Sequence, residues 1–214
     1  GAIDSFSGAV TFAETLTLFP NAMIGDIAAS GAVLFGNEVD IGANASIGSI
    51  FSSGSTITFT NTLEMAAGAS VSEIDAKGAV SFKDIDASGS SVSIGNIESR
   101  SGAVTLSGNL TLGNGGTIGT IIGSGSVQIG KDGASLSLES GAAISGITAS
   151  HGSLSFDQDL SLGSGASIGD LFAAEGVTFV GTVDLESGAT LGSGNTIDGG
   201  SGGVTFSNTL SLEE

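Results

Sequence analysis

The chain repeats one short unit along its whole length, and this repeat constrains the fold more than any other feature. Segments such as SGAVTF (7–12), SGAVLF (30–35) and SGGVTF (201–206) are copies of that unit. Its first apolar residue recurs at steps of 23, 24, 23, 24, 23, 27, 23 and 27 residues, at Val10, Val33, Ile57, Val80, Val104, Val127, Leu154, Val177 and Val204. A unit of this size cannot bury an apolar face alone, so the period predicts a stacked repeat array.

Each unit contains three apolar pairs, which in the first unit are Val10/Phe12, Leu16/Leu18 and Ile24/Ile27. Alternation with period two is typical of short strands, and the Gly, Ser and Asn clusters between the pairs predict tight corners. Stacking equivalent strands in parallel turns all three apolar faces inward. We therefore predict an all-β fold, a single parallel β-solenoid of triangular cross-section. It has about nine rungs of 23 or 24 residues, three strands of three to five residues per rung, and a length of roughly 40 Å.

The whole chain, residues 1–214, is expected to form one domain. Its rungs begin near Ser7, Ser30, Ser53, Lys77, Ser101, Ser124, Ser150, Ala174 and Ser201. The alternation of 23 and 24 arises because every second rung has one extra residue between its last apolar residue and the next rung, which indicates a two-rung superrepeat. Two larger insertions, around Lys131-Asp132-Gly133 and Gly192-Ser193-Gly194, are expected at corners.

One inward column is predicted to be largely aromatic. It runs through Phe12, Phe35, Phe59, Phe82, Leu106, Ile129, Phe156, Phe179 and Phe206, and so holds seven of the 11 Phe residues. Stacked aromatic rings bury a large area at low entropic cost, so this column should be a main source of stability.

The composition excludes several classes of partner. The chain has 22 Asp and Glu against 4 Lys and Arg, a net charge of −18, and no Trp, Tyr or Cys. Nucleic acids and anionic lipids require cations, and single strands also require aromatic stacking platforms, so neither is expected as a partner. The absence of Cys excludes disulfides and thiolate zinc sites, and no apolar run is long enough for a membrane helix, so no membrane insertion is expected.

Catalysis is not expected either. The only His, His151, falls at a corner, and no carboxylate pair or activated hydroxyl can be assembled around it from the repeat pattern. Four scattered cations and no Trp or Tyr also do not supply the groups that polysaccharide-cleaving β-helices use. We therefore predict a non-enzyme without a small-molecule substrate.

An acidic column is predicted on the outside of the second strand, where Asp40, Glu64 and Asp86 should stack on consecutive rungs. Like charges at one strand spacing raise each other's pKa or attract a cation, so a weak Ca²⁺ site is one interpretation, and no other cofactor is expected. The alternative is a hydrated ladder that Lys77, Lys83 and Arg100 neutralise.

A second outward file, on the first strand, is rich in Thr. It runs through Thr11, Leu34, Thr58, Ser81, Thr105, Gln128, Ser155, Thr178 and Thr205. Flat Thr arrays on β-solenoids resemble those of ice-binding proteins, which gives a binding hypothesis. The alternative is that Thr simply suits an exposed strand.

The two ends of the chain suggest self-association. The first residues look like a third strand in which Ile3 and Phe6 match Ile24 and Ile27, whereas the last turn stops after its second strand. One copy could thus complete the last turn of another, giving a head-to-tail homopolymer; the alternative is a segment of a longer array, such as a long adhesin. The residues predicted to associate are Gly1, Ala2, Ile3, Phe6, Phe206, Leu210 and Leu212.

The acidic residues near both ends of the chain are expected to oppose this association. Residues 1–76 carry eight acids and residues 132–214 carry eleven, with no Lys or Arg in either segment. Both ends of the rod should therefore repel each other at low ionic strength, and salt or divalent cations should strengthen stacking.

Segments such as SGAVTF (7–12), NTLSL (208–212) and GASIGDL (165–171) give the chain an architectural resemblance to the Gly/Ser/Thr-rich β-solenoid rods of bacterial surface and secreted proteins, including filamentous-haemagglutinin-like adhesin passengers. The resemblance implies an extracellular or cell-surface location and a structural or adhesive role, and it implies no site residues.

Overall fold

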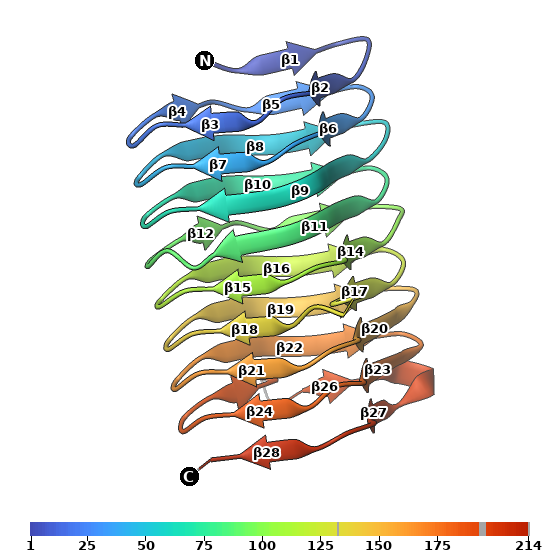
Figure 1. Cartoon of the computed structure of the whole chain (residues 1–214). Coiled ribbons are helices and arrows are strands. Elements are labelled where there is room, and N and C mark those ends of the chain that lie inside the picture. The colour runs from blue at the N-terminus through green and yellow to red at the C-terminus, as the bar shows by residue number, and fades with distance from the viewer. Residues whose placement is uncertain (132, 193–195, 214) are drawn as a thin grey trace.

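The computed structural model describes residues 1–131, 133–192 and 196–213. Within these residues the chain winds into nine parallel turns, stacked in one rod with the N- and C-terminal turns at opposite ends (Figure 1). As the chain descends in Figure 1, the front strands run to the left and the strands behind them run to the right, so the coil is right-handed. The prediction of an all-β, parallel β-solenoid is confirmed.

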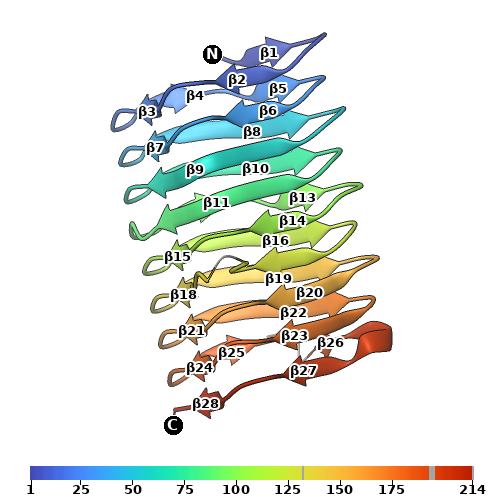
Figure 2. The same cartoon turned by 45° about the vertical axis from the view of Figure 1, so that its right-hand side comes forward.

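Three files of strands run along the rod, one for each side of the triangle. The first file, nearly edge-on at the right of Figure 1 and at the front of Figure 2, contains β2 (Val10–Phe12), β6 (Val33–Phe35), β14 (Val104–Leu106), β17 (Val127–Ile129), β20 (Ser153–Phe156), β23 (Gly176–Phe179) and β27 (Val204–Phe206). The second file contains β3 (Leu16–Leu18), β7 (Val39–Ile41), β15 (Leu110–Leu112), β18 (Leu136–Leu138), β21 (Leu160–Leu162), β24 (Val183–Leu185) and β28 (Leu210–Leu212). In two turns the first and second strands are continuous, as β9 (Ile57–Met65) and β11 (Val80–Ala87).

The third file forms a separate sheet on the far side of the rod in Figure 1. It contains β1 (Ile3–Ser5), β4 (Met23–Ile24), β5 (Ile27–Ala29), β8 (Ser46–Ser52), β10 (Ser70–Ala76), β12 (Ser93–Ile94), β13 (Ile97–Ser99), β16 (Thr117–Gly123), β19 (Ala143–Ala149), β22 (Ser167–Ala173), β25 (Thr190–Leu191) and β26 (Ile197–Asp198). A single 3₁₀ turn, η1 (Gly200–Gly202), follows β26 among the described residues.

Five strands of the third file are longer than predicted. β8, β10, β16, β19 and β22 each have seven residues rather than three to five, because each includes both members of the third apolar pair. In β8, Ile47 and Ile50 both point inward across the Gly48-Ser49 step. A Cβ at Gly48 would lie 2.9 Å from the backbone carbon of Gly25, so a side chain there would crowd the preceding rung.

The register places like residues above one another. Val10 aligns with Val33, which aligns with Ile57, and this in-register pairing continues to Val204. The predicted aromatic column is confirmed: neighbouring Phe rings stack with centroids 4.5 to 5.0 Å apart, interrupted only by Leu106 and Ile129. Away from the ends these side chains are fully buried, so the core is a continuous cylinder inside the coil.

The two larger insertions lie at different places within a rung. Asp132, Ser193 and Gly194 themselves lie outside the described residues. Leu136 still pairs in register with Leu110, so the first insertion precedes β18 at a corner as predicted. The second insertion separates β25 from β26, which pair with the two halves of β22. It therefore interrupts the third side of the triangle, and its predicted corner location is wrong.

The alternation between 23 and 24 residues has a structural cause at the corner after the third strand. In two of the wider corners Ser52 and Ser99 point inward and are fully buried, where Ala29 and Ala76 stand in the neighbouring narrower corners. The Ser99 hydroxyl donates to the Gly78 carbonyl (2.9 Å) of the preceding rung and accepts from the Gly102 amide (3.0 Å). Ser52 does the same with Gly31 (2.7 Å) and Ser55 (3.2 Å), so these two wide corners are each held by one buried hydroxyl. In the wide corner before β20 the inward position is taken by Ala149, which has no hydroxyl.

Candidate functional site

The C-terminal end face exposes the inward columns of the core. Val204, Phe206, Leu210 and Leu212 are 40, 39, 45 and 67% exposed, whereas Val177 and Phe179 directly above are fully buried. These exposed side chains belong to β27 and β28, and β26 lies one level higher on the third side. The face is therefore a step, with two strands low and one strand high.

The N-terminal end face is also a step, in which β1 covers β5 and leaves β4 uncovered. β1 lies one level above β5 on the third side, while β2 and β3 form the top of the first and second sides (Figure 1). Val10, Phe12 and Leu16 pack on the core from above and are partly exposed.

The predicted register of the first residues is wrong. Ile3 pairs with Ile27, not with Ile24, so Phe6 occupies the corner position of Ser30 instead of an inward column. Phe6 is accordingly 92% exposed. Gly1 reaches only as far as Gly25, whose amide donates to the Gly1 carbonyl (2.9 Å). Of the predicted association residues, Ile3 thus continues the core, whereas Phe6 lies outside it.

The acidic column is placed as predicted. Asp40 pairs in register with Glu64, and Glu64 with Asp86. The pKa of the Glu64 carboxyl is raised, first by a hydrogen bond with the Glu38 side chain, then by partial burial and by the charges of Asp40, Glu38 and Asp86. Among the described residues, no group of three or more acidic or imidazole side chains is arranged to hold a metal ion.

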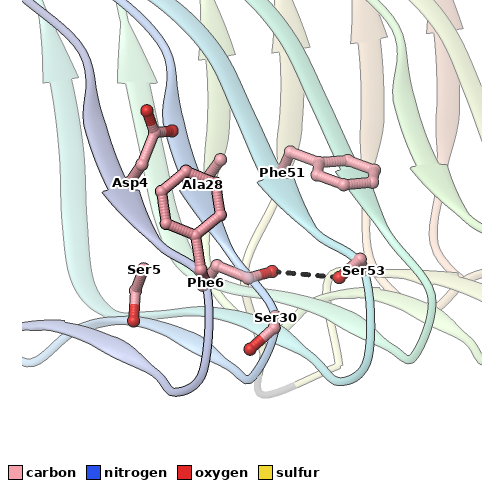
Figure 3. A pocket seen from close by; sticks show the side chains of 8 residues that line it. Asp4, Ser5, Phe6, Ala28, Ser30, Phe51 and Ser53 are labelled. Atoms are coloured by element: carbon pink, nitrogen blue, oxygen red, sulfur yellow. Dashed lines mark hydrogen bonds between the residues drawn. The ribbon is translucent and has the colours of Figure 1, made fainter.

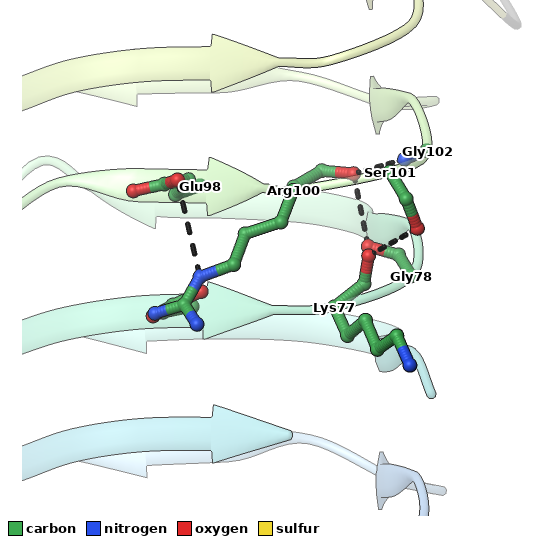
Figure 4. A network of polar contacts seen from close by, with 8 residues as sticks. Lys77, Gly78, Glu98, Arg100, Ser101 and Gly102 are labelled. Atoms are coloured by element: carbon green, nitrogen blue, oxygen red, sulfur yellow. Dashed lines mark hydrogen bonds and ion pairs between the residues drawn. The ribbon is translucent and has the colours of Figure 1, made fainter. Parts of the chain in front are cut away.

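Arg100 does not neutralise this column, and that part of the alternative interpretation is wrong. Arg100 lies on the third side of the triangle, where it pairs with Asp75 and approaches Glu98 to 4.0 Å (Figure 4). Its guanidinium also lies 5.5 Å from the Phe51 ring centre. Arg100 therefore joins three successive rungs and covers Asp75, which is only 6% exposed.

A hollow of about 270 Å³ lies beside the N-terminal turns. It forms where the small Ala28 stands between Asp4 and Phe51 in the outward file, and Phe6 and Phe51 border it (Figure 3). Its lining is mainly apolar and hydroxylic, with Asp4 as its one titratable group, so it supplies no acid–base pair. His151 lies far along the chain at an exposed corner, with Nδ1 3.1 Å from the Ser124 carbonyl oxygen.

The predicted Thr file is also in register on the first side, and Leu34 and Gln128 interrupt it. Gln128 donates to Asp157 through a hydrogen bond of 2.6 Å, so this part of the file belongs to a polar network.

Two sets of bridging residues were not predicted from the sequence. One is the pair of buried corner serines, Ser52 and Ser99. The other set lies in the corner between the first and second strands. There Asp84, Asn109 and Asp159 accept hydrogen bonds of 2.8, 3.1 and 2.8 Å from backbone amides of the next rung. The Ser/Ala alternation and the recurrent Asn or Asp before the second strand were the available sequence signals.

No protein-family model, curated protein or solved structure matches the chain. Within the part of the chain that the structure describes, no helix has the length and apolar character needed to cross a bilayer.

Proposed function

We propose that this chain is a non-catalytic structural protein, a β-solenoid rod that associates head to tail with further copies into filaments. The observation that carries the proposal is the exposure of core columns at the C-terminal face, where Leu210 and Leu212 are 45 and 67% exposed. Burying these side chains against an equivalent apolar face is favourable, and strand edges gain hydrogen bonds at the same time.

The long sides of the rod favour end-to-end over sideways association. They carry most of the 22 acidic residues of a chain with net charge −18, so side-by-side contacts meet repulsion along their length. An end contact buries apolar columns over a much smaller charged area. The expected product is a single linear filament rather than a bundle.

An extracellular or cell-surface location is part of this proposal. Its support is the architectural resemblance to Gly/Ser/Thr-rich rods of bacterial surface and secreted proteins.

The test is filament formation by the purified 214-residue chain, followed by electron microscopy and sedimentation over a range of concentrations and salt. We expect unbranched fibres whose length increases with protein concentration. Two matched variants identify the contact: Phe206→Ser at the end face and Phe172→Ser on the side, where the wild-type rings are 39 and 38% exposed. Phe206→Ser should raise the concentration needed for assembly, and Phe172→Ser should leave it unchanged. Monomeric rods under all conditions, or equal effects of both variants, would contradict the proposal.

A second candidate function is binding of an ordered surface, such as ice, by the Thr file. The straight in-register arrangement of Thr58, Ser81 and Thr105 favours it. Thermal hysteresis that Thr58→Tyr and Thr105→Tyr abolish would support this function, and no hysteresis in the folded wild type would exclude it.

A further inference from the structure

We propose that the two end faces form one junction of fixed register, in which β1, β2 and β3 of one copy add directly below β26, β27 and β28 of another. This inference rests on the proposed function, because it specifies how the self-association takes place. The inferred register also identifies the pair of like charges that weakens the self-association.

The shapes of the two faces define the fit. At the C-terminal face the third side ends at β26, one level above β27 and β28. At the N-terminal face the third side begins with β1, one level above β2 and β3. Because β1 aligns with β5 alone, it would cover β26 and leave β25 without a strand below it. The two steps fit only when the third sides of both copies coincide. Rotation by one side of the triangle leaves a gap under one strand and a collision at another.

The side chains that meet in this register match column by column. Extending the internal pairing across the junction aligns Ile197 with Ile3, Val204 with Val10, Thr205 with Thr11, Phe206 with Phe12, Leu210 with Leu16, Ser211 with Thr17 and Leu212 with Leu18. Phe206 would then stack on Phe12 as it already stacks on Phe179, at 4.6 Å between ring centres. The aromatic column would run unbroken from one copy into the next.

Both end faces have a wide corner, because seven positions separate Ile197 from Val204 at one face and Ile3 from Val10 at the other. The junction therefore stacks two wide corners, whereas wide and narrow corners alternate within the rod, so the corner lengths do not favour this register. Ser5 of the lower copy takes the inward position that Ser52 and Ser99 hold within the rod.

One aligned pair opposes the fit. Asp198, in the outward file of the third side, would stand directly above Asp4 of the lower copy, and both carboxylates are exposed. In-register neighbours on parallel strands are about 4.8 Å apart, so these two charges repel. Among the described residues that align across the junction, this is the one like-charged pair, so it specifically weakens assembly at low salt.

The register is tested by disulfide formation between copies, which the absence of native Cys makes unambiguous. Thr11→Cys and Thr205→Cys are prepared separately, mixed and oxidised. An in-register junction brings their Cα atoms to about 4.8 Å, within the range that a disulfide accepts, so a covalent heterodimer should form rapidly. The matched control pair, Thr11→Cys with Ser211→Cys, places the thiols on different sides of the triangle and should not couple. Equal coupling of both pairs, or homodimers of Thr205→Cys alone, would overturn the proposed register.

The charge is tested with Asp4→Lys and with Glu139→Lys, an exposed control far from either end that changes the net charge equally. At low salt Asp4→Lys should lower the concentration needed for assembly by roughly two- to fivefold, and Glu139→Lys should have a much smaller effect. Adding Asp198→Lys to Asp4→Lys should restore the repulsion. Asp198→Asn, which keeps the acceptor for the Gly200 amide (2.9 Å), should act like Asp4→Lys but more weakly.

The outcomes separate the two proposals. If the wild type forms no filaments and neither Cys pair couples, the proposed function fails and this junction fails with it. If filaments form but the two Cys pairs couple equally, or if Asp4→Lys and Glu139→Lys have equal effects, self-association stands and the junction described here is wrong.

Discussion

At the scale of single residues, the most regular feature is a left-handed backbone position in the turn between the second and third strands. The chain makes this connection eight times, and one residue with positive φ occurs in each: Asn21, Asn44, Gly68, Ser91, Gly115, Gly141, Gly165 and Gly188. In the second turn the Ala45 amide donates to the Gly42 carbonyl (2.9 Å), which is the hydrogen bond of a β-turn with its third residue left-handed. Glycine therefore recurs at this position for a backbone reason.

Ser91 is the least suited of these residues, since its φ is 56° and serine favours this region less than glycine or asparagine do. Ser91→Gly should raise the free energy of unfolding by up to about 1 kcal/mol, the relief of strain being partly offset by the greater entropy of glycine in the unfolded chain. Chemical denaturation measures this, with Ser91→Ala as the control that keeps the strain. A decrease in stability for Ser91→Gly would contradict the turn argument.

Glu64 gives the rod a pH dependence of defined sign. Because its pKa is raised in the folded state, the folded protein binds more protons than the unfolded chain between the ordinary glutamate pKa, about 4.3, and the raised value. The contribution of Glu64 to stability is therefore greatest at low pH and is lost as the pH rises through that window.

Glu64→Gln should consequently be more stable than the wild type at pH 7, by less than about 1 kcal/mol because exposed charges are screened. The difference should vanish below pH 4. Denaturant unfolding at a series of pH values measures it, and Asp40→Asn, which removes one neighbouring charge, should give a smaller change of the same sign. Parallel stability profiles for wild type and Glu64→Gln would exclude this coupling.

At the scale of elements, the corner after the third strand determines whether a rung has 23 or 24 residues. Ser99→Ala leaves the Gly78 carbonyl and the Gly102 amide without their buried partner, and should lower the free energy of unfolding by about 1–3 kcal/mol. Ser101→Ala is the matched control, because its hydroxyl donates to the Lys77 carbonyl (2.5 Å) at the surface of the same corner. Equal losses from both variants would show that burial of the hydroxyl is not the cause.

The strands themselves were predictable because their apolar spacing repeats with little change. Alternation with period two in Val10-x-Phe12 and Leu16-x-Leu18 defined which side chains point inward, and in-register stacking followed from the constant period. The third strand was predicted too short, because Ile47 and Ile50 are three residues apart and break the alternation. In the structure both side chains are nevertheless buried within one seven-residue strand.

At the scale of the whole molecule, the N-terminal half of the rod is built from units of two rungs, because the wide corners at Ser52 and Ser99 are bonded to the narrow corner of the preceding rung. Deleting residues 57–103 removes 47 residues and preserves the alternation of corners. Deleting residues 57–79 removes 23 residues, stacks two wide corners and deprives Ser99 of Gly78.

The two-rung deletion should therefore unfold at a higher denaturant concentration than the one-rung deletion, although it is the shorter rod. Circular dichroism should show β-structure in both. If the one-rung deletion, which keeps more rungs, is instead the more stable of the two, then the single rung and not the pair is the structural unit of the rod.

The candidate end faces were only partly predictable. In the structure the first and last strands lack a neighbour on one side, and Phe206, Leu210 and Leu212 are exposed there. The pairing of Ile3 with Ile27 was not predicted, since Ile3 and Phe6 have the same three-residue spacing as Ile24 and Ile27. Spacing alone allows both registers, and the hydrogen bonds of β1 to β5 select one.

The sequence by itself determined the solenoid, the number of rungs and the identity of each inward column, because a fixed period and strict alternation allow one stacking register over most of the chain. The tertiary structure alone decided the features that depend on contacts between rungs. These are the buried hydroxyl of Ser99, the partners of Arg100, the position of Phe6 and the steps at the two ends. The physical reason is that periodicity specifies which side of a strand faces the core, whereas lateral hydrogen bonds and charges are specified only by the rung that lies next to it.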